Sequence, residues 1–185
     1  RLEEAIKAFQ NAIRIDPNFT LAHNNLGNAL KAAGKADEAI AAFEQAIQLS
    51  PNYAQAHYNL ANALLVAGEQ DKAIAWYRSA LAIDPGFADA CKNLAKVLMD
   101  RGETEEAVAL FKRVLQRNRN DALAKHLLAA LQGETTSTAP QDYVIDLFNS
   151  VANSFDQRLV EELAYKAPEH LLNAVEKCAG KPHNA

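Results

Sequence analysis

Asparagine side chains recur along the chain at a fixed spacing. A 34-residue step separates Asn25, Asn59 and Asn93, and the same step separates Asn28, Asn62 and Lys96. A carboxamide carries both a donor and an acceptor, so it can pair with both polar groups of one peptide unit. A row of such groups on neighbouring elements would hold an extended chain by its backbone. The spacing therefore predicts a groove that binds a peptide segment.

Five further residues are expected near the same face. They are Lys31, Gln55, Tyr58, Asp89 and Lys92. Their charges are mixed in sign, and they do not form a basic clamp for a terminal carboxylate. We therefore expect the bound segment to be internal or extended.

A structural explanation of the asparagines is the alternative. Each could bond neighbouring backbone or fit the close packing between repeating units. A helix interior disfavours asparagine by up to about 0.7 kcal/mol relative to alanine, so the row needs some compensation. The two explanations are compatible with each other.

The residues best suited to catalysis or metal binding are scattered along the sequence. His23 and His57 recur at the repeat step, but a structural zinc site needs four ligands at short, defined spacing. We interpret these histidines as packing residues, and Cys91 and Cys178 as free thiols. The sequence contains no glycine-rich phosphate loop, nucleophile elbow or catalytic carboxylate pair. We expect no metal, no cofactor and no catalysis by this chain.

Each 34-residue period contains two stretches with the apolar periodicity of an α-helix. The clearest pair spans residues 21–33 and 36–49, and Gly34 between them suits a left-handed helix end. Pro17, Pro51 and Pro85 close successive units, because the residue before proline disfavours continued helix. Such a hairpin cannot bury its own apolar face and must stack on copies of itself. The pattern predicts an all-α solenoid of helical hairpins.

This pattern resembles the tetratricopeptide repeat, whose period is 34 residues. The resemblance rests on the stretch from Leu26-Gly27 to Pro51, with alanine replacing the glycine at Ala61 and Ala95. It implies a right-handed superhelix whose concave side is lined by the first helix of each repeat. The row of asparagines resembles the ladder in the repeat groove of O-linked N-acetylglucosamine transferases.

The repeat register divides the chain into an array, a linker and a tail. We expect a half repeat at 1–17, full repeats at 20–53, 54–87 and 88–121, a partial capping helix at 122–132, a linker at 133–140 and a helical segment at 141–185. The half repeat supplies only a second helix, so its apolar face of Ile6, Phe9 and Ile13 would lack a partner. We therefore expect self-association through this N-terminal helix.

The C-terminal segment has a resemblance of its own. The residues that carry it are Tyr143, Leu147, Phe148, the run 154–160, Leu163, Tyr165, Ala167 and Pro168. They resemble the lead-in of repeat-fused, S-adenosylmethionine-dependent methyltransferases, which precedes the nucleotide-binding strand and its glycine-rich turn. The sequence ends before either element. Two interpretations stay open, an interaction scaffold and the non-catalytic front portion of a methyltransferase, and in both the tail could cap the array.

Composition limits the remaining classes of protein to which the chain could belong. The 185 residues are 49% hydrophobic and 23% charged, with a net charge of -4 and only 2 Cys. A mildly acidic balance argues against nucleic-acid and anionic-membrane binding. No apolar run approaches the roughly 18 residues of a membrane span. We expect a cytoplasmic protein whose partner is a protein or peptide.

Overall fold

The computed structural model describes residues 1–134, and every regular element in that range is an α-helix. The eight helices of this range are α1 (Leu2–Ile15), α2 (Thr20–Ala32), α3 (Ala36–Leu49), α4 (Ala54–Val66), α5 (Gln70–Ile83), α6 (Ala88–Asp100), α7 (Thr104–Arg117) and α8 (Ala122–Leu131). None of them is long and apolar enough to cross a membrane. The predicted C-terminal segment 141–185 and most of the predicted linker lie outside the described residues.

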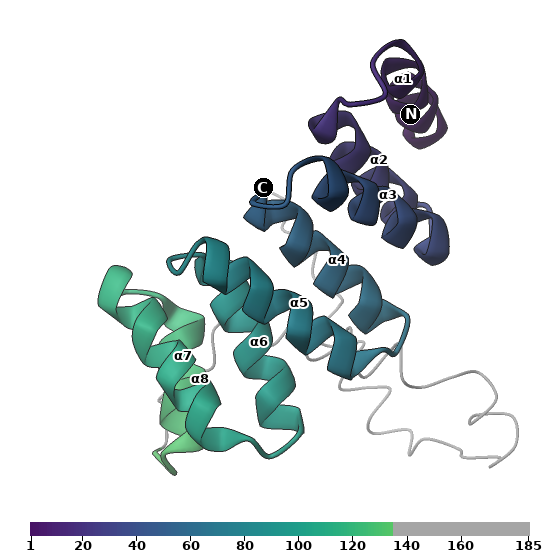
Figure 1. The fold of residues 1–185 in the computed structure, drawn as a ribbon. Coiled ribbons are helices and arrows are strands. Elements are labelled where there is room, and N and C mark those ends of the chain that lie inside the picture. The colour runs from purple at the N-terminus through teal and green to yellow at the C-terminus, as the bar shows by residue number, and fades with distance from the viewer. Residues whose placement is uncertain (135–185) are drawn as a thin grey trace, which may run out of the picture. The chain divides into compact units, whose positions relative to one another are not determined.

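The helices pair into antiparallel hairpins that stack in chain order (Figure 1). α2 packs against α3, α4 against α5 and α6 against α7, and each second helix also contacts the first helix of the next hairpin. α1 packs against α2 as a second helix, and α8 packs against α7 as a first helix. The predicted all-α solenoid of helical hairpins is confirmed.

A left-handed glycine follows each first helix. Gly34, Gly68, Gly102 and Gly133 have φ between 74° and 80°. At the end of α2, the Lys35 amide donates to the Leu30 carbonyl at 3.0 Å and the Gly34 amide to the Lys31 carbonyl at 3.0 Å. These two bonds satisfy carbonyl groups that the helix end would otherwise leave unpaired. Gly133 ends α8 in the same way, and α8 is shortened to 10 residues from the 13 of α2.

The core repeats with the sequence. In each hairpin one aromatic residue of the second helix is fully enclosed: Phe43, Tyr77 and Phe111 all have 0% exposure. A Cβ atom built on Gly27 would lie 2.6 Å from the Phe43 ring, closer than packed atoms can approach. Ala61 holds the equivalent position in the next hairpin and is also fully buried. The glycine is therefore required by the tighter packing of the first hairpin.

The N-terminal helix is packed less completely. α1 has no buried residue, and Phe9 is half-buried although it occupies the same repeat position as Phe43. The difference follows from the lack of a first helix beside α1 in the described residues. Self-association through this face stays a prediction.

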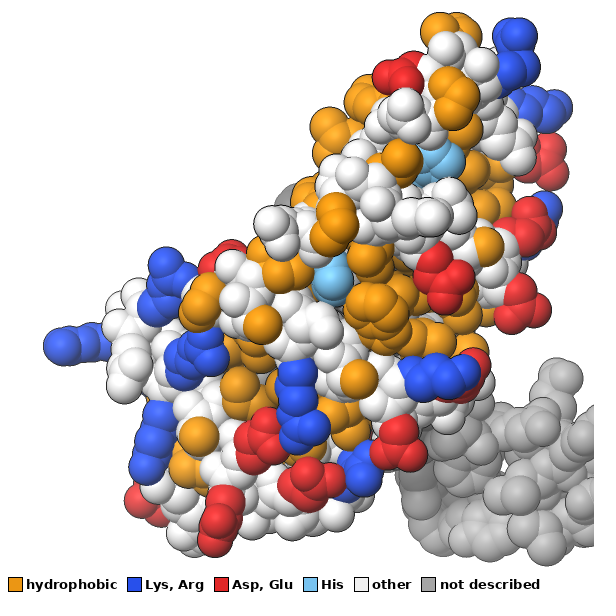
Figure 2. Space-filling model, in the orientation of Figure 1, with side chains coloured by type: hydrophobic (Ala, Val, Ile, Leu, Met, Phe, Trp, Pro, Cys, Tyr) orange, Lys and Arg blue, Asp and Glu red, His pale blue; other side chains and the backbone are white. Residues whose placement is uncertain are grey.

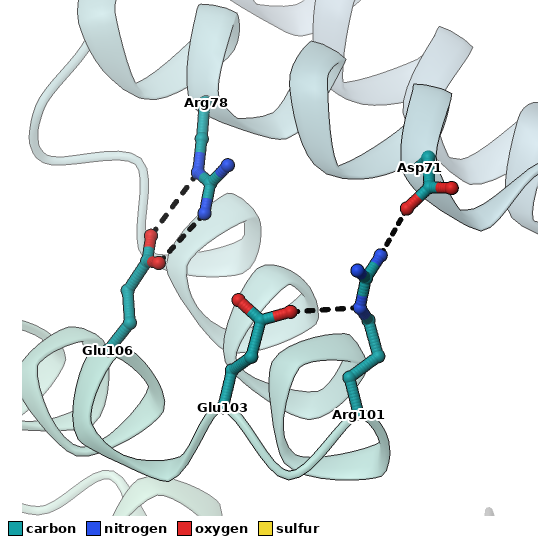
Figure 3. Close-up of polar contacts among 5 residues, drawn as sticks. All are labelled: Asp71, Arg78, Arg101, Glu103 and Glu106. Carbon is teal, nitrogen blue, oxygen red and sulfur yellow. Dashed lines mark hydrogen bonds and ion pairs between the residues drawn. The ribbon is translucent and has the colours of Figure 1, made fainter.

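Arginine side chains connect the last two hairpins on their exposed side (Figure 3). Arg78 of α5 donates to both carboxylate oxygens of Glu106 on α7, at 3.3 and 2.8 Å. Arg101, which follows α6, contacts Asp71 of α5 and lies 2.9 Å from a carboxylate oxygen of Glu103. Exposed ion pairs contribute little stability individually, so these contacts add little to the apolar packing that joins the hairpins.

Candidate functional site

The asparagines at the 34-residue step differ in exposure. Asn25 on α2 is exposed, Asn59 on α4 is 4% exposed, and Asn93 on α6 is half-buried. Asn28 and Asn62, one helical turn further along, are both half-buried. Equal repeat positions therefore do not give a uniform row.

Asn59 joins two neighbouring first helices. Its Nδ2 donates to Oδ1 of Asn24 at 2.9 Å, and its Oδ1 accepts from Nε2 of Gln55 at 3.1 Å. Asn24 is 3% exposed, so the bond between the two amides is enclosed. In this conformation Asn59 is closed to a peptide and instead holds α2, α4 and the Gln55 side chain in place. The structural explanation of the asparagines applies to this residue.

A second network lies on α4, α5 and α6. Nδ2 of Asn93 donates to Oδ1 of Asn62 at 3.0 Å and to the Tyr58 hydroxyl at 3.2 Å. The Tyr77 hydroxyl donates to the same Oδ1 of Asn62 at 2.5 Å. Burial raises the pKa of Tyr77, so its phenol stays protonated and keeps this donor role over the physiological pH range. Tyr77 was not among the residues that the sequence predicted for the site.

These bonds fix the orientation of two half-buried amides. They use the nitrogen of Asn93 and the oxygen of Asn62, so the atoms outside the network are the acceptor Oδ1 of Asn93 and the donor Nδ2 of Asn62. One acceptor and one donor on adjacent helices match the N–H and C=O groups of a peptide backbone. The Tyr58 ring adds an apolar surface beside them, and its centroid lies 4.8 Å from that of Phe87.

Lys92, one of the lysines predicted for the site, forms ion pairs with two carboxylates. Its Nζ lies 3.2 Å from Asp89 and 3.4 Å from Asp121. Burial alone would lower the pKa of Lys92, but the two carboxylates outweigh it and raise the pKa. Asp121 was missed from the sequence, and it also caps α8 by accepting from the Ala124 amide at 2.9 Å.

The other two lysines predicted for the site are Lys31 and Lys96. Lys31, near the end of α2, is half-buried, and burial lowers its pKa. Lys96 on α6 is also half-buried. On the face shown in Figure 2, Lys and Arg side chains are interspersed with Asp and Glu side chains over the centre of the view, and several Lys and Arg side chains gather at its left edge.

His23 and His57, which recur at the repeat step, each form a hydrogen bond with a backbone carbonyl. Nε2 of His23 lies 2.9 Å from the Pro17 carbonyl, and Nε2 of His57 lies 2.8 Å from the Pro51 carbonyl. Each histidine thus ties a first helix to the turn before it. Cys91 holds the same position in the third full repeat as a buried free thiol, and burial raises its pKa. Within residues 1–134, the His, Cys, Asp and Glu side chains form no group of three or more that could hold a metal ion.

The enclosed amide pair leads to a prediction about stability. Asn59→Ala should lower the free energy of unfolding by about 1–3 kcal/mol, because Oδ1 of Asn24 is left buried without its donor. Replacing both Asn24 and Asn59 by leucine should cost less than Asn59→Ala, since no enclosed amide is left unpaired and the half-buried Gln55 can bond water instead. Urea denaturation followed by circular dichroism measures both. Asn11→Ala, at an exposed asparagine of α1, is the control, and a double variant at least as damaging as Asn59→Ala would contradict this role.

Comparison with protein families agrees with this architecture. Models of the tetratricopeptide repeat match residues 24–86 and 71–131, and a TPR repeat model matches residues 1–34. Together the matches span residues 1–131, more than half of the chain, and the chain belongs to the tetratricopeptide-repeat (TPR) proteins. They end before the methyltransferase-like segment, so they give that resemblance no support. No curated protein matches the sequence.

Solved structures share the fold. The crystal structure of MamA has a TM-score of 0.65 at 24% identity, covering 70% of this chain and 76% of that one. YrrB, a TPR protein with an unusual peptide-binding site, has a TM-score of 0.63 at 23% identity, covering 68% of this chain and 65% of that one. The first TPR of Spaghetti (RPAP3), bound to the HSP90 peptide SRMEEVD, has a TM-score of 0.58 at 23% identity. The match covers 62% of this chain and 90% of that one.

Proposed function

We propose that the array is a non-catalytic scaffold that binds an extended peptide segment along its first helices. The observation that carries this proposal is the oriented pair of half-buried amides, Asn62 on α4 and Asn93 on α6. The network of Tyr58 and Tyr77 holds these amides before any ligand arrives, which lowers the entropy cost of binding. Two structures that share the fold, YrrB and the Spaghetti repeat, are peptide binders by their own descriptions.

The peptide contacts extend from this pair along the same helices. Asn25 and Asn28 of α2 would continue the amide contacts toward the N-terminus, and Lys96 of α6 would lie beside Asn93. Gln55, held by Asn59, would line the path between them. The compensation of Lys92 by two acidic residues supports an internal segment rather than a terminal carboxylate as ligand.

Removing one amide of the pair should weaken peptide binding. A binder chosen from an array of unrelated extended decapeptides would be measured by fluorescence anisotropy against the wild type and Asn93→Ala. We expect the dissociation constant to rise by about 5–15-fold, the equivalent of one lost hydrogen bond of about 1–1.5 kcal/mol. Methylating the backbone nitrogens of the same peptide should weaken binding as well, because the amides would recognise backbone groups.

Controls separate this effect from loss of structure. Asn11→Ala, on the exposed side of α1, should bind as the wild type does. Circular dichroism of Asn93→Ala should retain the helical signal, since the Tyr77 hydroxyl still holds Asn62. Unchanged affinity in folded Asn93→Ala would reject the amide pair as the binding site.

A further inference from the structure

A hollow of about 380 Å³ lies between α1, α2 and α3. Its apolar wall comprises Ile13 of α1, Leu26 and Leu30 of α2, and Ala42 of α3. None of these residues belongs to the proposed peptide path. The size is at the small end of the range for ligand pockets, about 300–1,000 Å³.

The second full repeat shows what fits in such a hollow. A 34-residue step takes Ala42 to Trp76 and His23 to His57. The Trp76 ring lies 5.2 Å from the His57 ring, centroid to centroid, at an interplanar angle of 60°. His57 is only 7% exposed there, whereas His23 in the first repeat is half-buried. The indole of the second repeat therefore covers a histidine ring whose equivalent in the first repeat, His23, is more exposed.

The third full repeat closes the equivalent place in another way. Leu110 holds the position of Ala42 and is 8% exposed. Arg78 and Glu106, which form the bidentate ion pair in Figure 3, stand where the first repeat has Gln10 and Glu38. The first repeat thus has the small Ala42 where the third has Leu110. Its Gln10 and Glu38 also form no ion pair like that of Arg78 and Glu106.

We infer that the hollow of the first repeat binds a tryptophan side chain presented by a partner protein. The half-buried His23 ring and Leu26 side chain would contact the indole, as the His57 ring contacts Trp76 in the second repeat. The Glu38 carboxylate and the Gln10 amide, both in the rim, carry acceptors for the indole N–H. The chain has only one tryptophan, and that residue occupies the second repeat. The indole is therefore assigned to a partner protein rather than to a second copy of these repeats, whose tryptophan is engaged with His57.

Titration with N-acetyl-tryptophanamide tests this inference. Amide chemical shifts of the isotope-labelled full chain should change at Ile13, His23 and Leu30, with saturation. Ala42→Trp should abolish these changes, because its own indole would fill the hollow. Ala42→Leu, which reproduces the arrangement at Leu110, gives a second blocking variant if the larger residue disturbs folding.

A gain of binding provides the complementary measurement. Trp76→Ala opens the equivalent hollow in the second repeat, and the folded variant should bind a second N-acetyl-tryptophanamide beside His57. N-acetyl-leucinamide should bind at least about tenfold more weakly than the tryptophan analogue, because the aromatic group buries more apolar area. Shift changes that persist in folded Ala42→Leu and Ala42→Trp, no second site in folded Trp76→Ala, or equal affinity for both analogues would each overturn the inference.

Discussion

Replacing Phe43 by alanine is expected to lower the free energy of unfolding by about 3–5 kcal/mol. The ring is fully enclosed, and it lies so close to Gly27 that not even one methyl group fits between them. Removing it would leave a cavity between α2 and α3, which cannot close without moving a helix that also contacts the next hairpin. Urea denaturation monitored at 222 nm would measure the loss.

Phe9→Ala is a closely matched control for this change. Phe9 has the same residue type and repeat position as Phe43, but it is half-buried on α1. Less apolar surface is buried there, so we expect a loss of about 1–2 kcal/mol. Similar losses in the two variants would contradict the view that enclosure by a first helix makes Phe43 important.

The fold was predictable because the sequence repeats every requirement of the hairpin. The apolar periodicity locates the helices, and Gly34 with its equivalents marks where each first helix ends. Pro51 and Pro85 mark where each unit closes. Gly133, which follows the predicted partial helix 122–132, also marks a helix end, since it adopts the same left-handed conformation as the other three glycines. Each of these signals is local, so the sequence carries it directly.

The candidate site was less predictable because its contacts do not follow the repeat step. The bonds from Asn59 to Asn24 and from Asn93 to Tyr58 both join residues 35 positions apart, not 34. A third bond, from Asn93 to Asn62, joins residues 31 positions apart. Contacts between successive first helices therefore pair each asparagine with positions outside the repeat step, where the residue type varies. The asparagines at the 34-residue step therefore looked like one ladder, although Asn59 is enclosed and Asn25 is exposed. These pairings depend on how one hairpin packs on the next, and no single repeat carries that information.

Tyr77→Phe should have opposite effects on stability at neutral and at alkaline pH. At pH 7 the variant loses the 2.5 Å hydrogen bond to Asn62, at a cost of about 0.5–1.5 kcal/mol. Burial raises the pKa of Tyr77 above its ordinary value of 10.0. Above pH 10 the phenol therefore ionises in the unfolded chain while it stays protonated in the fold. The free energy of unfolding should then fall by up to about 1.4 kcal/mol per pH unit in the wild type.

The stabilities of the two proteins should consequently cross between about pH 10 and 11. Phenylalanine has no proton to lose, so the variant lacks this part of the alkaline decline and becomes the more stable protein. Other groups that titrate in this range, including Cys91, whose pKa is also raised by burial, are common to both proteins and cancel in the difference. Urea denaturation of both proteins at pH 7, 10 and 11.5 measures the effect. A stability difference that stays constant with pH would mean that the buried phenol ionises as readily in the fold as in the unfolded chain, and that its bond to Asn62 does not depend on an enclosed site.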